Sequence, residues 1–207
     1  MKPALIIVDV QNDFCPGGAL AVPNGDRVVP VVNDYSRRFA SAGLPIFASR
    51  DWHPSETTHF ATRGGPWPVH CVGGERGAEF HPDLHLPGTT RVVSKGQGAT
   101  EDAYSAFQAR DESGTLLPDL LRQAGVEKVY VAGLATDYCV KATVLDALRS
   151  GFQATLLVDA SRGVNVAPGD SEEAIAEMVG AGADVATLAR LNLEEAAEEP
   201  AGRVGSQ

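Results

Sequence analysis

Apolar, strand-like segments alternate along this chain with helix-like segments, and this alternation constrains the fold more than any other feature. The expected strands occupy residues 4–10, 44–49, 91–94, 128–132, 154–158 and 183–187. The expected helices occupy residues 24–42, 115–124, 136–149 and 171–180. Strands that are apolar on both faces belong to parallel sheets covered by helices. The sequence therefore predicts an α/β fold, a three-layer α/β/α arrangement around a six-stranded, mostly parallel sheet.

Length and charge limit the domain count and the classes of partner. The 207 residues suffice for one α/β domain, which we expect at 1–191, followed by a flexible Glu/Ala/Gly-rich tail at 192–207. A net charge of -10 without a Lys/Arg run argues against nucleic acid or an anionic membrane as a partner. No apolar run reaches the ~20 residues of a membrane span. No face of the predicted elements indicates an interface, so no oligomeric state is predicted.

The cysteines and the N-terminus indicate a cytoplasmic protein. The three cysteines are odd in number and lack metal-knuckle spacing, which fits a reducing compartment and provides no disulfide framework. The short apolar run at the N-terminus ends at Asp9, which is typical of a first strand rather than a signal peptide.

Reactive side chains follow the expected strands at their carboxyl ends. Asp9 ends the first strand, Asp51 the second and Lys95 the third, while Cys139 follows the fourth. Parallel α/β folds bind ligands at this edge of the sheet. We therefore expect the four side chains to lie near one another.

Asp9, Lys95 and Cys139 form a set suited to acyl transfer. A thiolate nucleophile needs a base and a cation, which Asp9 and Lys95 can supply. Cys139 falls near the start of a helix, with Thr136 as the expected N-cap, where the helix dipole favours thiolate. The free amides of Ala135 and Cys139 at this helix start suit a developing oxyanion. The alternatives are a helix-capping or loop-anchoring carboxylate for Asp9, an ion pair at a strand end for Lys95 and a packing role for Cys139.

The long loop at 52–88 contains all five histidines and both tryptophans, and its lack of periodicity indicates a functional segment. Asp51, His53 and His70 offer a carboxylate and two imidazoles, a donor set for Zn²⁺, Fe²⁺ or Mn²⁺, of which Zn²⁺ is expected first. His59 is a further and less secure ligand. The remaining two histidines are expected to be solvated.

Three aromatic residues in or near this region are expected to wall a flat apolar pocket: Phe14, Trp67 and Tyr104. Ordinary loop packing is the alternative for all three.

Five motifs surround these residues. They are I-I-V-D-V-Q-N-D-F-C-P-G-G-A-L, S-R-D-W-H-P, W-P-V-H-C-V, V-S-K-G and G-L-A-T-D-Y-C-V-K-A-T. Together they resemble the nicotinamidase/pyrazinamidase branch of the isochorismatase-like cysteine hydrolases, and the resemblance extends to about residue 191. It implies a six-stranded parallel sheet flanked by helices.

The resemblance also implies roles for individual residues. Asp9, Lys95 and Cys139 match the catalytic triad of the family. Ala135 and Cys139 match its oxyanion-hole amides, with a cis peptide expected between Leu134 and Ala135.

Metal and substrate contacts follow from the same resemblance. Asp51, His53 and His70 match metal ligands, and His59 matches a ligand found in part of the family. The residues that match the substrate pocket are Phe14 and Trp67, which would sandwich a pyridine ring, Tyr104 as a nearby wall, and Ala135. Tyr138 stands where some relatives have His, and we expect it to influence substrate preference.

The implied reaction is hydrolysis of nicotinamide to nicotinate and ammonia in NAD salvage, with pyrazinamide as a further substrate. It implies a thioester on Cys139 and a divalent metal ion that binds the ring nitrogen. Three alternatives remain at this point. They are a related hydrolase of another amide or ether, a metallohydrolase in which Cys139 is structural, and a non-catalytic metal-binding or ring-binding protein.

Overall fold

The computed structural model describes residues 1–191 and 193. Its strands are β1 (Pro3–Val8), β2 (Ile46–Asp51), β3 (Arg91–Lys95), β4 (Lys128–Leu134), β5 (Gln153–Arg162) and β6 (Asp184–Ala186). Its α-helices are α1 (Val28–Ser41), α2 (Leu117–Gln123), α3 (Lys141–Arg149) and α4 (Asp170–Gly180). Each predicted strand and helix is present. The predicted flexible tail, apart from residue 193, lies outside the described residues.

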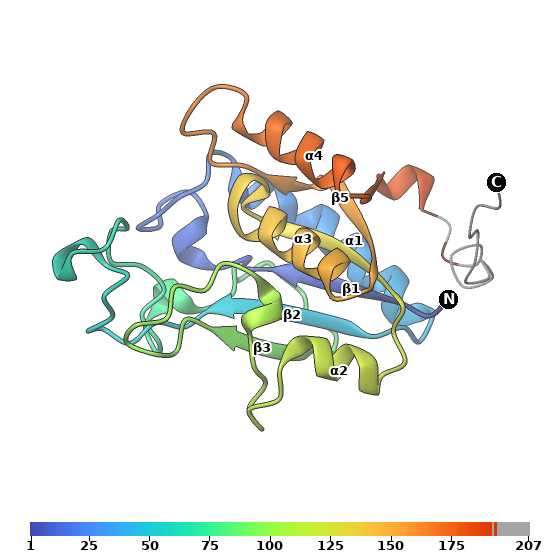
Figure 1. Ribbon diagram of the computed structural model, residues 1–207, viewed down its shortest axis with the longest axis horizontal. Helices are drawn as coiled ribbons and strands as arrows, with labels where there is room; N and C mark the ends of the chain where they lie inside the picture. The colour runs from blue at the N-terminus through green and yellow to red at the C-terminus, as the bar shows by residue number, and fades with distance from the viewer. Residues whose placement is uncertain (192, 194–207) are drawn as a thin grey trace.

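The six strands form one sheet in the order β3-β2-β1-β4-β5-β6, and every pairing is parallel (Figure 1). The α/β/α fold predicted from the sequence is therefore confirmed. The chain proceeds outward from β1 to β3 and then returns to place β4 on the other side of β1. The connections reverse between β1 and β4, the position at which open α/β sheets bind ligands.

Helices cover both faces of the sheet because alternate strand residues enter two separate cores. Ile6 and Val8 pack with α2, α3 and α4, whereas Leu5 and Ile7 pack with α1. The loop at 52–88 extends beyond the carboxyl ends of β1 and β2 (Figure 1). Among the described residues, no helix has the length and hydropathy needed to cross a membrane.

Two local expectations were wrong. The fifth strand was expected to end at residue 158, but β5 continues to Arg162. Asp159 therefore lies inside the strand, where it accepts a hydrogen bond from the Tyr35 hydroxyl. The helix after β4 begins with a π-helical turn at Thr136–Val140, and its N-cap residue is Ala135. Thr136 is the first residue of this turn rather than its cap.

Gly133 allows β4 to pack tightly against β1. Its φ is +118°, and a Cβ built there would lie 2.0 Å from the Val8 carbonyl oxygen. Gly151 also has a positive φ, +85°, but a Cβ there would meet nothing within 4 Å.

We expect Gly133→Ala to destabilise the fold by about 2 kcal/mol or more beyond the cost of Gly151→Ala, because only the first adds a backbone clash to the strained φ. Urea unfolding of both variants, followed by circular dichroism, measures the difference. Equal losses in the two variants would contradict the proposed close contact.

Candidate active site

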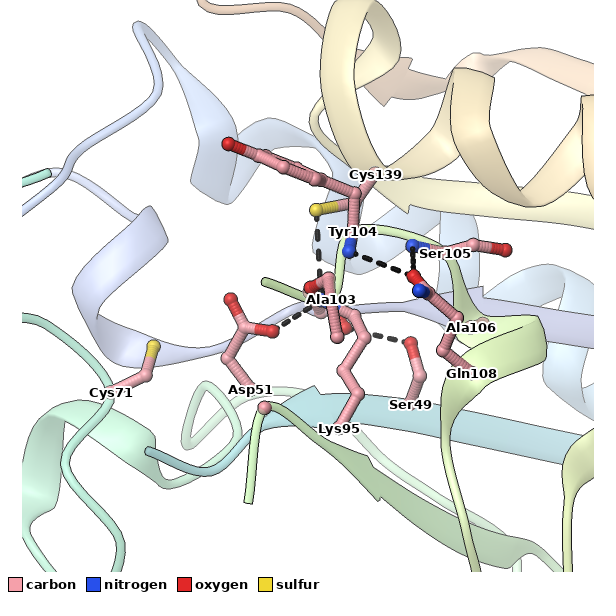
Figure 2. A network of polar contacts seen from close by, with 12 residues as sticks. Ser49, Asp51, Cys71, Lys95, Ala103, Tyr104, Ser105, Ala106, Gln108 and Cys139 are labelled. Atoms are coloured by element: carbon pink, nitrogen blue, oxygen red, sulfur yellow. Dashed lines mark hydrogen bonds and ion pairs between the residues drawn. The ribbon is translucent and has the colours of Figure 1, made fainter. Parts of the chain in front are cut away.

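Lys95 occupies the centre of a fully buried cluster at the carboxyl ends of β1, β2 and β3. Its Nζ lies 2.9 Å from Asp9 Oδ2 and 3.7 Å from Cys139 Sγ, and it also forms an ion pair with Asp51 (Figure 2). Lys95 and Asp51 are paired neighbours in the β2–β3 register, so their side chains point to the same face of the sheet. The structure thus brings together all four residues predicted to converge at this edge.

The cluster contains two carboxyl groups but one ammonium group, and this imbalance shifts the pKa of all three groups. Burial raises the pKa of the Asp9 carboxyl; Lys95 opposes this effect and Asp51 adds to it. Burial would also raise the pKa of Asp51, but Lys95 and His53 hold it well below its usual range. Burial alone would lower the pKa of Lys95, but the two carboxylates raise it well above its usual value. Asp51 and Lys95 are therefore a stable ion pair, and Asp9 is the carboxyl poised to exchange a proton.

Burial of Cys139 favours the protonated thiol and so opposes the preference for thiolate that its position near a helix start provides. Burial raises its pKa well above the usual value; Lys95 opposes this shift, while a hydrogen bond to Asp9 contributes to it. Loss of solvent is the largest cause of this shift, because the residue is only 8% exposed. A nucleophilic Cys139 consequently needs a base, and Asp9, which contacts the same Lys95 ammonium group, is the carboxyl available for this role.

Three buried imidazoles lie beside the carboxylate of Asp51. One nitrogen from each of His53, His59 and His70 lies within 4.8 Å of the others, which is compatible with a shared metal ion. Asp51 Oδ2 is 3.7 Å from His53 Nε2 and 3.9 Å from His70 Nε2. His59, the less secure ligand in the sequence, is part of this compact cluster.

The donor set fits a divalent cation. His53 Nε2 is buried and has no hydrogen-bond partner among the described residues, an arrangement that a metal ion would satisfy. Burial lowers the pKa of His59 and of His70, which keeps these imidazoles in the neutral form that binds metals. Nitrogen and carboxylate donors together suit Zn²⁺.

A pocket with about 480 Å³ of empty volume opens onto both clusters. Its lining includes every predicted substrate contact, namely Phe14, Trp67, Tyr104, Ala135 and Tyr138, together with Cys139, Asp51, His59 and His70. The Trp67 indole Nε1 donates a 2.9 Å hydrogen bond to the Tyr104 hydroxyl. Tyr138 packs edge-on against Trp67, with ring centroids 5.4 Å apart. Tyr138 thereby closes one side of the pocket next to the nucleophile.

The turn before the nucleophile has the predicted backbone. The peptide bond between Leu134 and Ala135 is cis, as the family resemblance implied. Ala135 and Cys139 both line the pocket, so their amides remain the predicted oxyanion donors.

Several polar residues that support the site were not identified in the sequence. The Ser49 hydroxyl donates a 2.7 Å hydrogen bond to Asp9 Oδ1. The Gln11 side chain donates to the Asp51 carbonyl and accepts from the Asp51 amide, both at 2.8 Å. Asp13 accepts a 2.7 Å hydrogen bond from the Cys71 amide, next to His70. These contacts join residues 40 or more positions apart, so only the strand register and the loop path reveal them.

Comparison with known proteins agrees with this geometry. The family model for the isochorismatase domain matches residues 3–190. The chain belongs to the isochorismatase family.

Relatives of this isochorismatase-family protein include the nicotinamidase of Escherichia coli, which is 45% identical over 203 residues covering 90% of this chain and 95% of the relative. The solved pyrazinamidase of Pyrococcus horikoshii in complex with zinc has 47% identity and a TM-score of 0.84, covering 91% of this chain and 100% of that one. PnC1 from L. infantum in complex with nicotinate has 35% identity and a TM-score of 0.80, covering 92% and 95% of the two chains.

Ser49→Ala should raise the pKa of Asp9 further, because the hydroxyl stabilises the ionised carboxylate. A base must be ionised to act, so the acidic limb of the kcat/KM profile should move to higher pH. The matched control is Ser36→Ala, which removes a buried hydroxyl that lacks a hydrogen-bond partner among the described residues. An unchanged acidic limb in Ser49→Ala, or an equal shift in the control, would argue against Asp9 as the base.

Proposed function

We propose that this protein hydrolyses nicotinamide to nicotinate and ammonia, and that it also accepts pyrazinamide. The observation that carries the proposal is the shared pocket: Cys139 lines the same apolar cavity as His59 and His70, two members of the three-histidine cluster. A flat heteroaromatic amide has a carbonyl for the thiol and a ring nitrogen for a metal. The names of the relatives, nicotinamidase and pyrazinamidase, support the same substrates.

Asp9 and Cys139 would form the acyl enzyme. Asp9 takes the thiol proton, and the sulfur attacks the carboxamide carbon to form a C–S bond. The resulting oxyanion accepts hydrogen bonds from the Ala135 and Cys139 amides. Asp9 then gives its proton to the leaving nitrogen, the C–N bond breaks, and ammonia leaves a nicotinoyl thioester behind.

A second proton transfer completes the reaction. Asp9 removes a proton from water, and the hydroxide oxygen attacks the thioester carbon. The C–S bond breaks, nicotinate forms, and Asp9 returns the proton to the sulfur. Lys95 remains protonated throughout and stabilises whichever of Asp9 and Cys139 carries the negative charge, because its Nζ contacts both.

Asp51, His53, His59 and His70 are the residues that would hold a divalent metal ion, with Zn²⁺ expected first. Such an ion would bind the ring nitrogen and withdraw electron density from the carboxamide. Phe14 and Trp67 would hold the ring between them, and Tyr138 would limit the size of the group that reaches Cys139. These residue roles, and the cytoplasmic location expected from three free cysteines, are part of the proposal.

Cys139→Ala should lower ammonia release from nicotinamide by roughly 10³-fold or more, because Cys139 is the only cysteine among the described residues that line the pocket. Cys15→Ala, which removes a different buried thiol, should stay within a few-fold of the wild type. A coupled ammonia assay measures both. Substantial activity in Cys139→Ala or Cys139→Ser would instead indicate a metallohydrolase in which the cysteine is structural.

Metal removal should act mainly on substrate binding. A chelator should raise KM for nicotinamide, and added Zn²⁺ should reverse the change, because the ring nitrogen loses its partner while the buried triad remains. Cys139→Ala should bind Zn²⁺ as tightly as the wild type, since its sulfur is not a proposed ligand. Full activity with nicotinamide in metal-free protein would contradict this role.

A further inference from the structure

All three imidazoles of the candidate metal centre are held through the same ring nitrogen. His53 Nδ1 lies 3.0 Å from the Gly96 carbonyl oxygen, and His70 Nδ1 lies 2.7 Å from the Pro68 carbonyl oxygen. His59 Nδ1 lies 2.8 Å from Asp102 Oδ1. A neutral imidazole that donates from Nδ1 has its lone pair on Nε2, so each of these contacts leaves Nε2 available to a metal.

His59 differs from the other two because a charged side chain holds it. His53 and His70 donate to backbone carbonyls, whereas the acceptor for His59 is a carboxylate that is 64% exposed. A carboxylate behind a histidine ligand fixes the ring orientation and increases the basicity of the nitrogen that binds the metal. A backbone carbonyl also orients the imidazole ring, but because it has less negative charge it increases the basicity of the metal-binding nitrogen less.

We propose that Asp102 is a positioning residue that makes His59 a ligand of the metal centre. This inference rests on the proposed metal site. Asp102 does not touch the ion or the substrate; it acts by fixing the side chain of His59. The presence of His59 in the metal shell then depends on the segment that follows β3, rather than on the 52–88 loop alone.

The backbone on both sides of Asp102 is fixed to the site. Before it, the Ala99 carbonyl accepts a 2.8 Å hydrogen bond from the Thr58 amide, next to His59. After it, the Ala103 carbonyl accepts a 3.3 Å hydrogen bond from Lys95 Nζ (Figure 2). Asp102 therefore lies between one anchor to the histidine loop and another to the triad, which holds its exposed carboxylate in place.

A third anchor connects this segment to the nucleophile. The Ala106 amide donates a 2.9 Å hydrogen bond to Thr143 Oγ1, and this hydroxyl donates a 2.7 Å hydrogen bond to the Cys139 carbonyl. Gln108 Oε1 accepts from the Tyr104 and Ser105 amides, both at 3.1 Å (Figure 2). One segment thus contacts the metal shell, the pocket wall and the helix that contains the nucleophile.

The test measures the Zn²⁺ affinity of the purified full-length protein by competition with a chromophoric chelator. Asp102→Ala should weaken Zn²⁺ binding by about 10- to 100-fold. Asp102→Asn keeps an acceptor oxygen for His59 and should lose less. Asp83→Ala is the matched control, because Asp83 is an exposed acid 4.0 Å from His81 Nδ1, outside the cluster, and this variant should bind Zn²⁺ like the wild type.

A double-mutant cycle separates positioning from a general charge effect. In a His59→Ala background, Asp102→Ala should cause no further loss of Zn²⁺ affinity, because the ring that it positions is absent. Wild-type affinity in Asp102→Ala would overturn the inference. An equal loss in the presence and absence of His59 would also overturn it.

Two further measurements distinguish this inference from the proposed function. If His53→Ala binds Zn²⁺ as tightly as the wild type, the metal site is wrong and the inference about Asp102 fails with it. If the wild type binds Zn²⁺ through these histidines but releases no ammonia from nicotinamide, the proposed function fails while the role of Asp102 stands.

Discussion

The buried ammonium group of Lys95 is the constraint on which the rest of the site depends. Two carboxylates and a sulfur lie within its reach in a region without solvent, where isolated charges are very costly. Asp9 and Asp51 together carry more charge than Lys95 balances, so the cluster retains a negative charge that favours a cation nearby. His53 Nε2 has no hydrogen-bond partner among the described residues and lies 3.7 Å from Asp51 Oδ2, which is compatible with a cation bound by both. The charges of Lys95, Asp9 and Asp51 thus affect both the proposed metal centre and the proposed triad.

The topology explains how these charged residues, which are distant in the sequence, come together in the fold. Parallel strands end at a common edge, and the reversal of connections between β1 and β4 places Asp9 and the Cys139 turn on adjacent strands. The β2–β3 register aligns Asp51 with Lys95. The loops that follow β2 and β3 then provide the histidines and the residues that orient them. The fold provides rigid positions for the triad, while loop contacts determine the metal shell.

The sequence predicted the sheet and the convergence at its edge because apolar periodicity and the carboxyl-end rule depend on local patterns. The sequence did not predict the side-chain contacts between residues that are far apart in the chain. The Ser49–Asp9 and Asp102–His59 contacts depend on register and loop path, which no periodicity records. The helix position of Cys139 favours thiolate, whereas burial, visible only in three dimensions, favours thiol, so the sequence alone did not show how strongly this residue depends on a base.

The most direct test of the account is the chemical state of Cys139 during turnover. Protein mixed with nicotinamide can be quenched rapidly in acid, digested and examined by mass spectrometry. A Cys139 thioester predicts a nicotinoyl group on the peptide that contains Cys139, and none on the peptides that contain Cys15 or Cys71. An acyl group on another residue, or undiminished ammonia release after complete alkylation of Cys139, would contradict it.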